Sequence, residues 1–103
     1  MQCKARKFDA STSTVAQLAP QVDESLRIRG DDPTEDNTTR AHQGAAALLS
    51  YALGPGSGSE PVETSLADVL GSLMHTADAL GIDFHSALNR AEICYQDEVS
   101  GTL

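Results

Sequence analysis

Apolar residues recur at helical spacing over residues 62–80, and this is the clearest pattern in the sequence. With successive residues about 100° apart, the apolar side chains fall within an arc of about 140°. They are Leu66, Val69, Leu70, Leu73, Met74, Ala77 and Leu80. The opposite stripe consists of Ser65, Asp68, Ser72, His75 and Ala79. We therefore expect an amphipathic helix that ends at Gly81 in a left-handed cap, with Ile82 making the accompanying apolar contact.

A second helix is predicted directly after this cap. Asp83 is a typical N-cap residue, and Phe84, Leu88, Ala91 and Tyr95 follow at spacings of four, three and four. Only about two residues separate the two helices, so we expect them to fold back on each other as an antiparallel hairpin.

An earlier helix is predicted to begin at a clear start signal. Asp32 is placed to act as N-cap, Pro33 occupies the first helical position and Glu35 lies three residues past the cap. The helix should run to about Leu53, and the Gly-rich run 54–61 reads as a flexible linker. Its apolar face is formed by Ala41, Ala45, Leu48, Leu49, Ala52 and Leu53.

Residues 1–30 are interpreted as an N-terminal extension of uncertain structure, and residues 31–103 as one helical domain. Apolar residues of the extension recur at helical spacing, but Pro20 interrupts them. They are Val15, Leu18, Val22 and Leu26. We expect a short helix or turn, followed by a helical piece from about Pro20.

Composition supports an all-α class. The 103 residues suit a single domain, and two Phe, two Tyr and no Trp leave Leu, Val, Ile and Ala to build the core. We expect a small helical bundle. Alanine covers more than one face of the helix from residue 33, so either a homodimer buries this surface or residues 1–30 cover it within a monomer.

Charge and cysteine usage limit the functions open to the protein. A formal net charge of −8 disfavours nucleic acid as a partner. No run of 18 apolar residues is present, and the basic N-terminus lacks the apolar stretch of a secretion signal. We expect a cytoplasmic protein without a membrane partner. Cys3 and Cys94 match no metal-binding spacing and are predicted to be reduced, with Cys94 packed beside apolar neighbours.

The run from Ser65 to Phe84, SLADVLGSLMHTADALGIDF, continuing through Ala91 and Tyr95 to Glu98, carries a family resemblance. It resembles the second half of the MazG-like all-α nucleoside triphosphate pyrophosphohydrolases. There a helix that opens with a Glu-Leu-x-Asp-Val-Leu motif is followed by a Gly-Ile-Asp turn and another helix. The resemblance implies a nucleotide ligand and Mg²⁺ held by carboxylates from two helices.

Only part of the implied metal site is present in this sequence. Asp68 matches the aspartate of the family's ExxD motif, but Ser65 stands in place of its glutamate, and residues 41–49 contain none of the expected glutamates. Asp68 is the candidate metal ligand, and Asp68, Ser72 and His75 are the candidate ligand-binding residues. Two hypotheses follow: binding of a nucleotide or related phosphate ligand, with Mg²⁺-dependent hydrolysis, or a catalytically inactive helical module for dimerisation or protein interaction.

Overall fold

The computed structural model describes residues 2–52 and 57–101, and it confirms the all-α class. Its three long helices are α2 (Pro33–Ala52), α3 (Val62–Leu80) and α4 (Phe84–Ser100). A short helix α1 (Val15–Leu18) and the 3₁₀ turns Ala19–Gln21 and Ser57–Ser59 complete the elements that the structure describes. The long helices begin where the sequence predicts, but the predicted end of α2 near Leu53 and the first part of the linker lie outside the described residues.

The predicted caps at the two ends of the α3–α4 turn are confirmed. Gly81 has φ 69°, in the left-handed region, and its N–H donates to the carbonyls of Ala77 and Asp78. The N–H of Ile82 donates to the Ala77 carbonyl at 2.9 Å. Asp83 caps α4 by accepting from the N–H groups of His85 and Ser86. The chain direction therefore changes within three residues.

The N-terminal segment differs from its prediction beyond Gln21. Thr14 caps α1, and Pro20 lies inside the 3₁₀ turn, after which no helix forms until α2. The reason is that residues 22–32 run along α2, and several of their backbone N–H groups donate hydrogen bonds to α2 side chains instead of to helical carbonyls. The N–H of Asp23 donates to His42 Nδ1 at 2.9 Å, and that of Arg29 donates to Asp36 at 2.8 Å.

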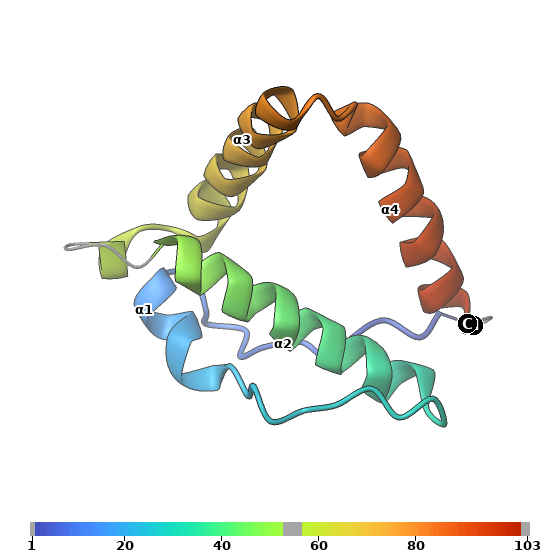
Figure 1. The fold of residues 1–103 in the computed structure, drawn as a ribbon. Coiled ribbons are helices and arrows are strands. Elements are labelled where there is room, and N and C mark those ends of the chain that lie inside the picture. The colour runs from blue at the N-terminus through green and yellow to red at the C-terminus, as the bar shows by residue number, and fades with distance from the viewer. Residues whose placement is uncertain (1, 53–56, 102–103) are drawn as a thin grey trace.

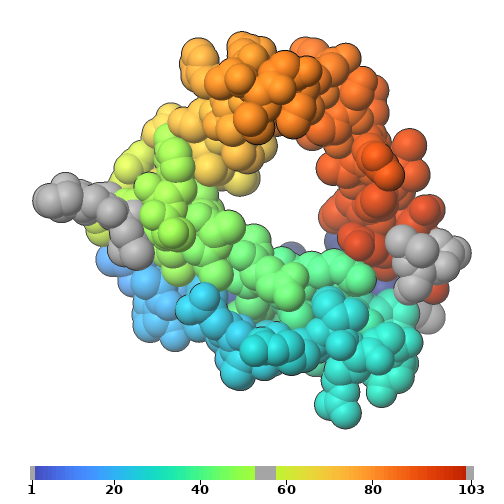
Figure 2. Space-filling model, in the orientation of Figure 1, coloured from blue at the N-terminus to red at the C-terminus, as the bar shows by residue number. Residues whose placement is uncertain are grey.

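The three long helices form the sides of an open triangle, which we call the ring (Figure 1). α1 lies at the corner between α2 and α3, and residues 2–9 run along α2 from the C-terminal end of α4 toward α1 (Figure 1). α3 and α4 diverge from the turn at Gly81, so the antiparallel packing expected for them is limited to that corner. Figure 2 shows an opening through the middle of the ring.

The ring makes the molecule flat and expanded. Its radius of gyration is 14.9 Å, whereas a compact chain of this length would have about 13 Å. The principal extents are 40 × 37 × 22 Å. The buried apolar residues are correspondingly small and few, and they lie mainly where α1 meets α2 and at the ends of the helices. They are Val15, Leu18, Ala45, Ala52, Ala77 and Val99.

A set of polar contacts, here called the latch, closes the ring between α2, the N-terminal segment and α4. The side-chain amide of Asn37 donates to the carbonyls of Cys3 at 2.7 Å and Glu98 at 2.9 Å. The N–H of Cys3 donates to the Val99 carbonyl at 2.6 Å. Arg40 forms an ion pair with Glu98 at 3.1 Å and donates to Asn37 Oδ1 at 2.8 Å. Val99 is buried beside these contacts, so the C-terminal end of α4 is held on α2.

Candidate functional site

The predicted ligand-binding residues lie together on one stripe of α3. Asp68 and His75 are exposed, and Ser72 is half-buried. Sequence reasoning missed Tyr51, whose hydroxyl lies 2.8 Å from Ser72 Oγ and 3.3 Å from the Asp68 carbonyl. These contacts fasten the end of α2 to α3. They also occupy the Ser72 hydroxyl, so Asp68 and His75 are the predicted ligand-binding residues whose side chains are exposed.

The residues around Asp68 do not fit the magnesium site that the resemblance implies. Among residues 2–52 and 57–101, no group of three or more His, Cys, Asp or Glu side chains could hold a metal ion. Ser65, at the position of the family's glutamate, is only 1% exposed, and its hydroxyl has no hydrogen-bond partner among the described residues. A carboxylate at this position would therefore lie inside the protein instead of beside a solvated ion.

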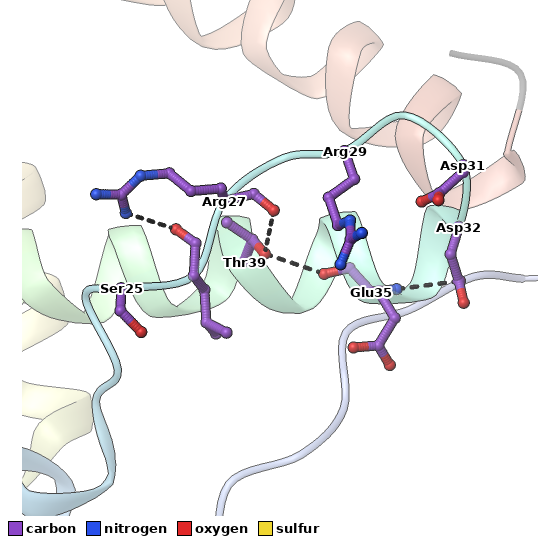
Figure 3. A pocket seen from close by; sticks show the side chains of 8 residues that line it. Ser25, Arg27, Arg29, Asp31, Asp32, Glu35 and Thr39 are labelled. Carbon is purple, nitrogen blue, oxygen red and sulfur yellow. Dashed lines mark hydrogen bonds between the residues drawn. The ribbon is translucent and has the colours of Figure 1, made fainter.

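A polar recess of about 730 Å³ lies between the loop 25–32 and the first turns of α2 (Figure 3). Part of its charge is already engaged within the protein. The Arg27 guanidinium donates to the carbonyls of Glu24 and Leu26, and Glu35 accepts from Arg6 at 2.6 Å. Thr39 donates to the carbonyls of Arg27 and Glu35. We interpret the recess as the seam that attaches the loop to α2.

Asp36, a buried residue of α2, also attaches the loop 25–32 to this helix. Its carboxylate accepts the N–H of Arg29 at 2.8 Å and that of Gly30 at 2.9 Å. These hydrogen bonds, the one from Arg29 first, lower the pKa of Asp36 below its ordinary value, although desolvation acts in the opposite direction. The side chain is 6% exposed, so its function is structural.

A large apolar depression lies at the corner between α2 and α3 and has a volume of about 580 Å³. We call it the apolar groove. It is formed chiefly by Gly44, Ala47 and Leu48 of α2 and by Leu66, Leu70 and Leu73 of α3. The three α3 leucines are 43–49% exposed. Asp9 is its one charged lining residue among those the structure describes.

A second exposed apolar strip runs along α4. Phe84, Leu88, Ala91 and Tyr95 share one face at helical spacing, and we call this strip the α4 face. Leu88 is 47% and Tyr95 50% exposed. Tyr95 and Val99 line the corner between α4 and α2, so the C-terminal end of the strip lies at that corner.

The sequence identified these apolar residues but assigned them to a core between α3 and α4. The structure leaves most of them exposed, because α4 is held on α2 by the latch. Cys94 is also exposed, so the packing function predicted for it is wrong. Both cysteines are free.

None of the helices in the described part of the chain has the length and hydropathy needed to cross a bilayer. Comparison with family models, with curated proteins and with solved structures finds no match to this chain.

Proposed function

We propose that this protein is a helical module that assembles as a homodimer, in which a second copy covers the apolar groove and the α4 face. The observation that carries the proposal is the surface area. The chain exposes 7213 Å², whereas a folded monomer of 10.8 kDa would expose about 5,500 Å². The excess is about 1,700 Å² per chain.

That excess matches what a permanent dimer removes from solvent. If two chains each covered it, the interface would bury about 3,400 Å² in total, within the range of about 2,000–5,000 Å² typical of obligate homodimers. The surface has the required chemistry as well. The apolar groove and the α4 face contribute half-exposed leucines and one charged lining residue among the described ones, and the centres of obligate interfaces are likewise depleted of charge.

Sedimentation equilibrium over a range of protein concentrations tests the proposal. We expect wild-type protein to be dimeric at about 10 µM and its melting temperature to rise with concentration. Leu70→Glu should be monomeric, because an unpaired buried charge costs about 3–5 kcal/mol, at least a roughly hundredfold weaker dissociation constant. Ile93→Glu is the matched control, since Ile93 is exposed on α4 outside the α4 face. A monomeric wild type with a concentration-independent melting temperature would rule the proposal out.

A second candidate function is binding of a nucleotide or related phosphate ligand with Mg²⁺, followed by pyrophosphate release. It is supported by the sequence resemblance over residues 65–84 and by the exposed side chain of Asp68 on α3. Nucleoside triphosphates with Mg²⁺ or Mn²⁺ should then raise the melting temperature of wild type and not that of Asp68→Ala. Absence of both a thermal shift and pyrophosphate release would eliminate this candidate.

A further inference from the structure

We infer that the α4 face of each copy occupies the apolar groove of the other, so that the two rings interlock. The inference rests on the proposed dimer and specifies its contacts. Four properties of the structure support it: the shape of the groove, the position of α4 within its own ring, the length of the α4 face and the distribution of charge.

The groove is shaped to receive a helix. Its α2 side includes the small residues Gly44 and Ala47 beside Leu48. Apart from the adjacent residues and the nearby backbone of α2, no described atom lies within 4 Å of the position that a Cβ would take at Gly44. Small residues on one helix allow the backbone of another to approach closely. The opposite side is formed by leucines of α3 that can interdigitate with an incoming apolar strip.

The α4 helix of the same chain is kept away from this groove. The latch joins its last turn to the far end of α2 through Asn37, Cys3 and Arg40. While these bonds hold, α4 lies across the opening from the α2–α3 corner (Figure 1). The helix that fills the groove must therefore come from another chain.

The length of the α4 face matches the α3 side of the apolar groove. From Phe84 to Tyr95 the α4 face spans about 16 Å at 1.5 Å per residue. The α3 residues that line the groove run from Val62 to Leu73 and also span about 16 Å on the same basis. The α4 face is therefore long enough to lie along the whole α3 side of the groove.

Charge and symmetry agree with reciprocal insertion. Neither surface would bury an uncompensated cluster of charge, because the α4 face is uncharged and Asp9 is the one charged residue among the described residues that line the groove. Each chain carries one groove and one α4 face. In a dimer with a two-fold axis, each groove therefore receives the α4 face of the other chain, and no unoccupied groove remains to bind a third chain.

Disulfide trapping between two singly substituted chains tests the inference. Both chains carry Cys3→Ser and Cys94→Ser; one then receives Ala47→Cys in the groove and the other Ala91→Cys on the α4 face. The control replaces Ala91→Cys by Asn89→Cys, which lies on the other side of α4. After subunit mixing and mild oxidation, mass spectrometry identifies the disulfide between the two chains.

We expect the Ala47→Cys and Ala91→Cys chains to cross-link about a hundredfold faster than the control pair. Paired cysteines in an assembly meet at an effective concentration on the order of millimolar, against about 10 µM for diffusing chains. Equal cross-linking of both pairs in a protein that sediments as a dimer would overturn the inference and leave the dimer intact. If the protein sediments as a monomer, the proposed homodimer itself is refuted. If a substituted chain fails to dimerise, Gly44→Cys with Leu88→Cys gives the same comparison.

Discussion

Asn37 and Glu98 lie 61 positions apart in the sequence and are joined by a 2.9 Å hydrogen bond from the side-chain amide of Asn37 to the Glu98 carbonyl. The same amide donates to Cys3, and its oxygen accepts from Arg40. Asn37 is 7% exposed, and each polar atom of its side chain has a partner. One side chain therefore connects three segments of the ring.

Asn37→Ala should destabilise the protein by about 1–3 kcal/mol, because it leaves the part-buried Cys3 carbonyl without this donor, whereas the Glu98 carbonyl keeps the N–H of Gly101. Urea unfolding at a fixed protein concentration measures the change. Asn89→Ala on the exposed side of α4 is the control and should stay within about 0.5 kcal/mol. A loss for Asn37→Ala no larger than that of the control would show that the latch contributes little to the fold.

Asp36→Asn should weaken the protein at neutral pH and make it less sensitive to acid. The folded-state pKa of Asp36 lies below that of the unfolded chain, chiefly because of the Arg29 N–H. Its carboxylate therefore stabilises the fold above about pH 4, and this stabilisation is lost as the pH falls through the folded-state pKa. The stability difference between wild type and Asp36→Asn should narrow between about pH 5 and pH 3. A difference that is constant over this interval would contradict the assignment.

Ser65→Ala should leave the protein as stable as wild type or stabilise it by about 1 kcal/mol, since a buried hydroxyl without a partner carries a desolvation penalty. Ser50→Ala, at an exposed position of α2, is the control: it measures the stability gained from the higher helix propensity of alanine alone, about 0.5 kcal/mol. Thermal unfolding of both variants separates the two effects. Marked destabilisation by Ser65→Ala would mean that the hydroxyl has a bonding partner in solution.

Gly81→Ala and Gly71→Ala should change stability in opposite directions. Gly81 has φ 69°, a conformation that costs an L-residue roughly 1–2 kcal/mol. Gly71 lies inside α3, and apart from the adjacent residues and the nearby helix backbone no described atom lies within 4 Å of the position that an added Cβ would take. Alanine there should therefore add about 0.5–1 kcal/mol of stability. Chemical denaturation distinguishes the signs, and stabilisation by Gly81→Ala would argue against the left-handed cap.

The sequence was sufficient to predict the helices because their signals are local. Asp32, Pro33, Gly81 and Asp83 mark boundaries through hydrogen bonds within a few residues, and apolar spacing gives the faces between them. The arrangement of the helices was not predictable in this way. A short turn limits the distance between two helix ends but not the angle at which the helices diverge. In this protein the angle depends on contacts distant in sequence, such as the hydrogen bond between Asn37 and Glu98.

For the apolar groove and the α4 face as well, the sequence predicted the local pattern but not the arrangement in space. The sequence identified the apolar stripe of α3 and the apolar residues of α4, but spacing alone does not state which other surface covers them. The buried run Asp36–Thr39 was missed entirely. Its residues are polar and resemble an ordinary solvated first turn. Each of them has a partner in the irregular segments 2–6 and 27–30, which carry no periodic signal.

The backbone hydrogen bond between Cys3 and Val99 has a consequence for biosynthesis. A ribosome makes residue 3 early and residue 99 late, so nascent polypeptide can form individual helices but cannot complete the closed shape until Val99 has left the exit tunnel. Contacts between such distant positions also carry the largest loop-closure entropy and slow the final folding step. Premature termination before Val99 would therefore yield a chain with most of its helices and no closed topology.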